Sequence, residues 1–191
     1  EIGSDKLHTL VKGERSSKFE SLYLLRSGID ANDSGKIVFA SKSKETDKIY
    51  LYDLNERNVT REFKFDDLIA ARSPQFSPDG KQVIFSGVRR SGYADLYLLD
   101  LLSGDYRALT DDIYYDTDPT FSVDGSRILF ASDRGEHGKT GSLNIFQLEP
   151  ATLAIQQLTH GAFHDQTPEA TEKGIYFSSD REGTYNLFLL A

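Results

Sequence analysis

The sequence contains no cysteine among its 191 residues. Disulfide bonds and thiolate metal sites are therefore excluded, while the redox compartment stays open. No apolar run approaches the roughly 20 residues of a membrane-spanning helix, so we expect no membrane insertion. Basic residues are the minority, with 22 Lys and Arg against 30 Asp and Glu, for a net charge of −8. This balance argues against a nucleic-acid partner, because binding to a phosphate backbone depends on Lys and Arg.

Signatures of catalysis are also missing. The sequence has no Gly-x-Ser-x-Gly elbow, no His-Glu-x-x-His pair and no glycine-rich phosphate loop. Each of these patterns places a nucleophile, a metal or a phosphate in a fixed geometry. We therefore predict that this chain holds no catalytic residues and is not itself an enzyme.

What the sequence does have is repetition. Residues 73–86 (SPQFSPDGKQVIFS) return as residues 118–131 (DPTFSVDGSRILFA). Each copy is typical of two short strands joined by a tight turn, in which Gly80 or Gly125 supplies the positive φ that follows a type I turn. A repeat of this kind constrains the architecture more than any single residue does.

Aromatic residues extend the repeat over the chain, and those of the second strands are spaced 45 to 47 residues apart. They recur in the predicted second strands as Phe39, Phe85, Phe130 and Phe177, and in the third strands as Tyr50, Tyr97, Phe146 and Phe188. The repeating units are residues 24–65, 73–110, 118–159 and 166–191. A period of this size with four strands per unit is typical of propeller blades. We predict an all-β fold, a β-propeller of four-stranded antiparallel blades in a single domain over residues 1–191. A β-sandwich does not need such similar units.

The same pattern predicts the core. The second strands are apolar on both faces, so we expect them to be buried on both. Phe85, Phe130 and Phe177 should lie between adjacent blades, together with Val83 and Ile128.

Both ends of the chain fall inside a predicted blade. Residues 6–11 read as the outer strand of a neighbouring blade, and the last unit stops after its third strand. The chain begins with Glu1 rather than Met, which suggests a processed or excised chain. We favour an arc of about four blades cut from a larger propeller over a closed four-bladed ring. In the ring, residues 6–11 would pair with residues 186–190.

The units resemble the TolB-like, WD40-like propeller repeats, often named PD40 repeats. The resemblance rests on residues 74–80 (PQFSPDG), on the Ser-Asp-Arg steps at 132–134 and 179–181, and on the third strands opening with Asp95-Leu96-Tyr97 and Asn144-Ile145-Phe146. It implies a six-bladed fold, a bacterial periplasmic or extracellular location, no cofactor and a role as a protein-interaction platform.

Other members of this group imply two further functions. Related propellers precede the hydrolase domain of prolyl-oligopeptidase-like enzymes, and residues 18–39 resemble a propeller found beside a zinc-peptidase-like domain. The leading hypothesis is thus a non-catalytic protein-binding module. The alternatives are an accessory propeller that gates substrate for a linked peptidase domain, and a polysaccharide-binding propeller.

The candidate binding residues lie in loops that should share one face of the propeller. These loops are residues 89–93, 111–116, 133–142 and 160–166, and their polar and aromatic composition suits a binding surface. The residues selected for partner binding are Arg90, Tyr93, Tyr115, Asp116, Arg134, His164, Asp165 and Arg181.

Repeated acidic residues in these loops allow two interpretations. Asp116 and Asp165 each precede a proline by three residues, near the expected channel mouth, where carboxylates could bind Ca²⁺. The favoured alternative is that each caps its own loop through backbone amides. For Asp133 and Asp180, each followed by Arg, we favour an Asx-type turn with the Arg paired to a neighbouring blade. The alternative is a charged rim for a partner.

Histidines add one more candidate. His137, His160 and His164 fall in two of these loops. A metal site would need three neutral rings to converge on one ion. Ordinary solvent-exposed histidines are the favoured interpretation, so no metal ligand is assigned.

Overall fold

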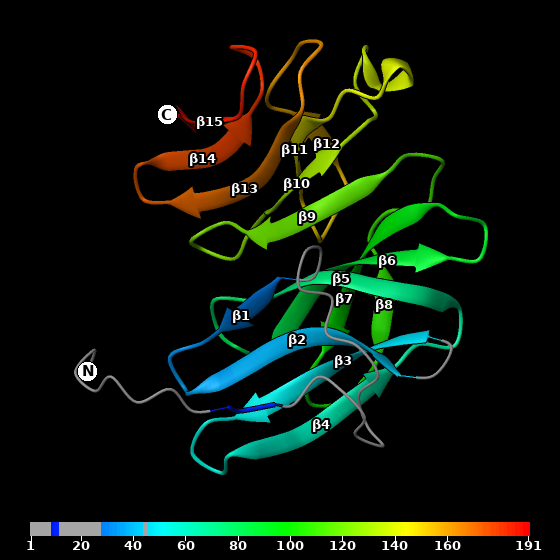
Figure 1. The fold of residues 1–191 in the computed structure, drawn as a ribbon, viewed down its shortest axis with the longest axis vertical. Helices are drawn as coiled ribbons and strands as arrows, with labels where there is room; N and C mark the ends of the chain where they lie inside the picture. The colour runs from blue at the N-terminus through cyan, green and yellow to red at the C-terminus, as the bar shows by residue number, and fades with distance from the viewer. Residues whose placement is uncertain (1–8, 12–27, 44–45) are drawn as a thin grey trace.

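The computed structural model describes residues 9–11, 28–43 and 46–191. Their strands form four antiparallel sheets, which follow one another as the blades of a propeller arc (Figure 1). Within each sheet the strands lie in chain order, and each is antiparallel to the next. The predicted fold class is confirmed.

The blades have the following strands. The first contains β1 (Ile29–Ala31), β2 (Lys36–Ser43), β3 (Thr46–Asp53) and β4 (Asn58–Lys64), and the second contains β5 (Leu68–Phe76), β6 (Gln82–Arg89), β7 (Ala94–Asp100) and β8 (Tyr106–Ala108). The third contains β9 (Asp116–Phe121), β10 (Ile128–Ser132), β11 (Asn144–Leu148) and β12 (Ile155–Gln157), with a short 3₁₀ helix η1 (Gly138–Thr140) before β11. The fourth contains β13 (Asp165–Thr171), β14 (Gly174–Ser179) and β15 (Asn186–Leu190).

Apolar side chains fill the spaces between blades. Phe85 and Val83 pack into a cluster shared by the first and second blades, whereas Ile84 faces the third blade. Phe130 and Ile128 are fully buried between the second and third blades, and Phe177 lies in a cluster with third-blade residues. The predicted burial is confirmed.

Each blade also carries one cross-strand aromatic pair. The partners sit opposite each other on the second and third strands, with ring centroids 5.4 to 5.9 Å apart. The pairs are Phe39–Tyr50, Phe85–Tyr97, Phe130–Phe146 and Phe177–Phe188. Such pairs stabilise a sheet beyond the area they bury.

The predicted turns are confirmed at both glycines. Gly80 has φ 68° and Gly125 has φ 73°. In the first of these turns the Ser77 hydroxyl donates to Asp79 Oδ1 at 2.7 Å, and the Lys81 N–H donates to the same oxygen at 3.1 Å. The carboxylate therefore holds the loop that the glycine closes.

The inner strands begin earlier than predicted. β5 starts at Leu68 rather than near Pro74, because the strand continues through a bulge instead of starting after it. The residue before each inner-strand proline has a positive φ, namely Ser73 at 48°, Asp118 at 51° and Thr167 at 49°. Proline cannot donate to the ladder, and the bulge absorbs the missing hydrogen bond while pairing continues on both sides.

The last sheet has three strands in the described part of the chain, with β15 paired to β14. The predicted outer strand at residues 6–11 lies mainly outside the described residues. Thr9, Leu10 and Val11 are described and are not in a strand. Val11 packs against Phe39, Tyr50 and Tyr52 of the first blade. Pairing of this segment with β15 is thus not seen among the described residues, which form an arc of four blades.

The one helix among the described residues is η1, and nothing in that part of the chain has the length and apolarity of a membrane-spanning helix.

Candidate functional site

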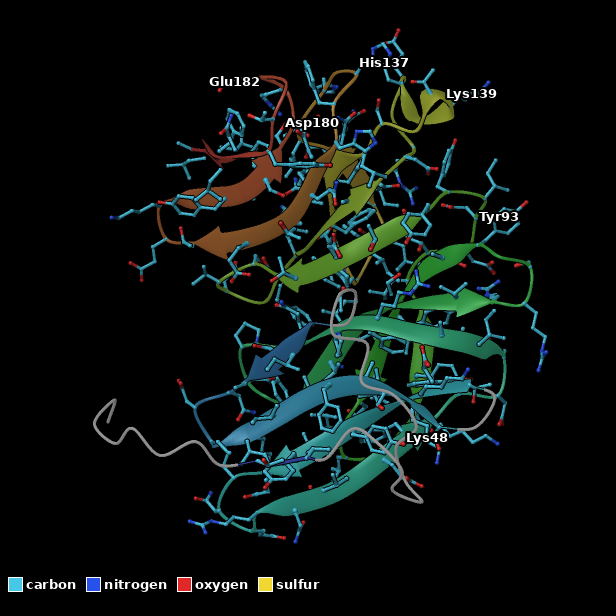
Figure 2. All side chains as sticks on the ribbon, viewed as in Figure 1. Lys48, Tyr93, His137, Lys139, Asp180 and Glu182 are labelled. Carbon is cyan, nitrogen blue, oxygen red and sulfur yellow. The ribbon has the colours of Figure 1, made fainter. Side chains whose placement is uncertain are left out.

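One face of the arc gathers the loops between second and third strands together with the connections between blades. We name it the loop face and define it as residues 89–93, 111–115, 133–143, 160–164 and 180–185. Isolated parallel bridges join Ala94 to Tyr115 and Leu143 to His164, so each connection lies against the adjacent loop. Figure 2 labels Tyr93, His137, Lys139, Asp180 and Glu182 on these loops.

Beneath the loop face, two buried ion pairs lock the third and fourth blades. Arg134, two residues after the end of β10, contacts both carboxylate oxygens of Asp116 through Nη2, at 2.7 and 2.6 Å. Arg181, after β14, contacts both oxygens of Asp165 at 2.8 and 3.0 Å. Both aspartates are fully buried. We call each of these pairs a clamp, because it fixes the start of the inner strand to the end of the second strand.

The other residues of the Ser-Asp-Arg steps complete the clamps. The Nε of Arg134 donates to Ser132 Oγ at 3.1 Å, which aims the guanidinium toward the inner strand. Asp133 Oδ1 accepts the Tyr115 N–H at 2.7 Å, and Asp180 Oδ1 accepts the His164 N–H at 2.8 Å. In each Ser-Asp-Arg sequence, the aspartate therefore binds the connection that arrives from the preceding blade, and the arginine binds the inner strand.

This geometry corrects two sequence-based interpretations. Asp116 and Asp165 do not cap their loops through backbone amides, because Arg134 and Arg181 occupy their carboxylates. The arginines do not reach a neighbouring blade for these contacts, because the clamped aspartate opens the inner strand of the same blade. The reason is the antiparallel register, which pairs Ser132 with Asp116 and Ser179 with Asp165, so that each Arg follows the second strand beside the start of the inner strand.

Aromatic rings surround both guanidinium groups. Arg134 lies over Tyr114, Phe130 and Phe146, with its Cζ 5.0 to 5.8 Å from the ring centroids. Arg181 is placed in the same way over Phe163, Phe177 and Phe188. Burial raises the pKa of Asp116, and attraction to Arg134 opposes that rise. The clamps thus join the cross-strand aromatic pairs to the loop face.

The predicted site residues fall into two groups. Asp116, Asp165 and Arg134 are in the interior beneath the loop face, with only 11% of the Arg134 side chain exposed. Their prediction as parts of an exposed surface is corrected, because the clamps bury them. Arg181 is more accessible, at 29% of its side chain. Arg90, Tyr93, Tyr115 and His164 lie nearer the surface and are described next.

Two cavities adjoin the exposed members of the set. Arg90 lines a cavity of about 460 Å³ between the first two blades, where Lys48 and Lys64 supply further positive charge. Tyr115 lines a cavity of about 380 Å³ on the inner strands and accepts a hydrogen bond from Arg72 at 3.2 Å. His164 Nδ1 lies 3.2 Å from Asp180 Oδ2, and the backbone hydrogen bond from His164 lowers the pKa of that carboxyl.

Exposed aromatic side chains mark the loop face. Among the described residues the exposed large aromatics are Tyr93, Tyr114 and Tyr185, at 45%, 37% and 56%, and all three lie on this face. The exposed large apolar residues in the loops of the opposite face are all aliphatic, namely Leu54, Leu102, Val123 and Leu153, whereas the loop face exposes Ile113 in addition to its tyrosines. Tyr114 and Tyr185 were not selected from the sequence. A signal existed, since Tyr114 lies in the connection between two repeat units and Tyr185 lies in the loop between the second and third strands of the last unit.

The fold and these repeated clamps define a propeller built from four-stranded blades. A family model described as the TolB beta propeller domain matches residues 20–139, more than half of the chain. The chain therefore belongs to the TolB beta propeller domain family. No curated protein matches it.

Solved structures show the same fold. The putative TolB from Agrobacterium tumefaciens has a TM-score of 0.67 at 23% identity, over 85% of this chain and 57% of that one. TolB from Acinetobacter baumannii has a TM-score of 0.61 at 19% identity, over 91% of this chain and 44% of that one. A puromycin hydrolase has a TM-score of 0.65 at 17% identity, over 86% of this chain and 29% of that one. The chain thus spans about half the length of the TolB structures.

Proposed function

We propose that this chain is a non-catalytic protein-binding module that contacts its partner through the loop face. The observation that carries the proposal is the confinement of the exposed aromatics Tyr93, Tyr114 and Tyr185 to that face. Tyrosine is enriched among the residues that dominate protein interfaces, because it offers a large, stiff and amphipathic contact area.

Contacts that hold two of the tyrosines in place support the same proposal. Tyr114 is packed under the Arg134 guanidinium, and the Tyr185 hydroxyl accepts a hydrogen bond from Gln166 at 2.7 Å. Side chains held in place before binding lose little conformational freedom when a partner arrives. By family resemblance we propose that the protein is exported to the periplasm or the cell exterior.

The test compares two triple variants as baits. One carries Tyr93→Ala, Tyr114→Ala and Tyr185→Ala on the loop face. The matched control carries Leu54→Ala, Leu102→Ala and Val123→Ala on the opposite face. A protein captured by the native chain and by the control should be lost by the loop-face variant. Calorimetry with the purified partner should then show a loss of at least about 1 kcal/mol for one or more single tyrosine variants.

The proposal fails if the opposite-face variant loses the partner while the loop-face variant keeps it. Both variants must retain the far-UV circular dichroism of the native protein for the comparison to count.

A second candidate function has a specific observation in its favour. The match to a puromycin hydrolase covers only 29% of that chain, so a propeller of this kind occurs beside other structure in a hydrolase. The alternative is an accessory propeller that gates substrate for a linked peptidase domain. The reading frame around this chain decides between them, since a hydrolase or zinc-peptidase domain there would favour the second function.

A further inference from the structure

Three carboxylates converge at the boundary between the second and third blades. They belong to Asp95 on β7, to Asp112 in the connection after β8, and to Asp116 at the start of β9. One ligating oxygen of each lies within 4.8 Å of those of the other two. Asp95 and Asp116 are fully buried, and the Asp112 side chain is 32% exposed.

The neighbouring cations do not balance these charges. Arg134 contacts Asp116 at 2.6 Å and Asp112 at 3.1 Å. Arg89 contacts the exposed Asp111 at 2.6 Å and comes only within 3.6 Å of Asp95 Oδ2. With Asp133 beside Tyr115, this region holds five carboxylates and two guanidinium groups. It therefore keeps an excess of negative charge, and two of the carboxylates, those of Asp95 and Asp116, are fully buried.

One buried oxygen points to a missing positive partner. Asp95 Oδ1 accepts the Asp112 N–H at 3.1 Å. Asp95 Oδ2 is buried, and no described group of the protein gives it a hydrogen bond. Leaving such an acceptor unsatisfied costs about 1–3 kcal/mol, and more when the group is charged. A feature that persists at this cost calls for an explanation.

The next blade boundary supplies an internal comparison. Asn144 takes the position of Asp95 there, and Asp165 takes the position of Asp116. The Asn144 amide donates to Gly161 O at 3.2 Å and lies 3.5 Å from Asp165 Oδ2. A donor thus faces the inner-strand carboxylate at one boundary, whereas a second carboxylate faces it at the other. The position of the third carboxylate also differs, because Gly161 stands at the second boundary where Asp112 stands at the first.

We propose that Asp95, Asp112 and Asp116 bind a hard divalent cation, with Ca²⁺ as the preferred ion. Ca²⁺ takes six to eight oxygen ligands at about 2.3–2.6 Å in irregular geometry. Two oxygens on opposite sides of one such ion are about 4.8 Å apart, so the three carboxylates fit a single coordination shell. The all-oxygen ligand set disfavours Zn²⁺, which prefers nitrogen and sulfur, and its irregularity disfavours Mg²⁺, which needs near-octahedral geometry.

The bound ion would fasten the connection after β8 to the second blade. That connection carries Tyr114, which the clamp holds from the other side. This inference does not depend on the proposed protein-binding function, because it concerns stability and metal affinity alone.

The test measures calcium binding by the intact protein after metals have been removed with a chelating resin. We expect CaCl₂ at about 100 times its Kd to raise Tm by about 5–10 °C. MgCl₂ at the same concentration should leave Tm unchanged. Tb³⁺ should show luminescence sensitised by tyrosine, because Tyr115 adjoins Asp116 in the chain, and CaCl₂ should displace it.

Two variants identify the site. Asp95→Asn introduces the residue that the next boundary carries and should abolish the Ca²⁺-dependent rise in Tm. Asp124→Asn changes the charge equally in an exposed turn of the opposite face and should keep the full rise. If Asp95→Asn does not fold, Asp112→Asn serves in its place, since that side chain is part-exposed.

Four outcomes would overturn the proposal. The first is the lack of any Tm shift up to about 10 mM CaCl₂, beyond the range of weak extracellular calcium modules. The second is an equal shift with MgCl₂, and the third is a full Ca²⁺ shift in both Asp95→Asn and Asp112→Asn. The fourth is a Tm that rises on acidification in the native protein but not in Asp95→Asn, without any response to Ca²⁺. A proton would then satisfy Asp95 in place of a metal.

Discussion

Replacing Arg134 with methionine measures what a clamp contributes to stability. The Arg134→Met variant keeps an unbranched apolar stem among the rings but removes the charge opposite Asp116, which is fully buried. Two charges about 4 Å apart attract by about 4 kcal/mol at an effective dielectric constant of 20. Removing one member of a buried pair costs about 3–5 kcal/mol, because the other charge stays in the interior. We expect the free energy of unfolding to fall by that amount.

A double-mutant cycle separates the ion pair from general damage. Urea denaturation, followed by circular dichroism and by tyrosine fluorescence, gives the free energy of unfolding of each variant. Asp116→Asn should also destabilise the protein, but the double variant should lose less than the sum of the two single losses. The expected coupling is about 2 kcal/mol, within the range of contacting pairs. A loss below about 1 kcal/mol for Arg134→Met, or additivity within about 0.5 kcal/mol, would refute the reasoning.

The fourth blade provides a matched comparison with the same geometry and more solvent. The Arg181 side chain is 29% exposed against 11% for Arg134. Water and salt screen a more exposed pair, so Arg181→Met should cost about half as much as Arg134→Met. A larger loss for Arg181→Met would show that burial does not set the strength of the clamps.

Three other predictions test the core and the turns. Phe130→Ala should cost about 3–5 kcal/mol in urea denaturation, because the ring is fully buried between blades, and a loss below about 1 kcal/mol would contradict that placement. Gly125→Val should destabilise the protein by about 1–3 kcal/mol, since φ is 73° and an added Cβ would lie 3.4 Å from Pro78 Cδ, while Gly125→Asn, which tolerates this backbone better, should cost less. Hydrogen bonds from Ser122 and Ser126 lower the pKa of Asp124 from 3.8 to about 2, which NMR titration of the carboxyl should show. Because the pKa of Asp124 is lower in the folded state, its contribution to the free energy of unfolding is present above about pH 4 and disappears as the pH falls toward 2. The Asp124→Asn variant should therefore lose less stability than the native protein over this pH range.

The sequence predicted the features that depend on local periodicity. The aromatic spacing located the second and third strands, because their alternation and burial repeat in every blade. Gly80 and Gly125 located the turns, because few other residues adopt a positive φ without strain. The whole fold class followed from these local patterns together with the repeat.

Features that depend on contacts across a blade were not predictable in the same way. The starts of β5, β9 and β13 were missed because Ser73, Asp118 and Thr167 adopt a positive φ that their residue types do not require. The partner of Arg134 was misassigned because the sequence does not show that β10 ends beside the start of β9. The exposure of individual loop side chains could not be predicted from the sequence either. Tyr114 and Tyr115 are neighbours in the chain, yet they make different contacts.

The clamps close within a single blade, and this has a consequence for how such propellers change over generations. A gene segment that runs from Asp116 to Arg134 carries both halves of one ion pair, and a segment from Asp165 to Arg181 carries both halves of the other. Duplication or loss of the whole third or fourth blade therefore keeps the two members of its clamp together. Successive blades meet chiefly through apolar faces, which tolerate exchange among side chains of similar volume. Blade number can thus vary by recombination at the connections, and chimeras joined there should fold with their clamps intact.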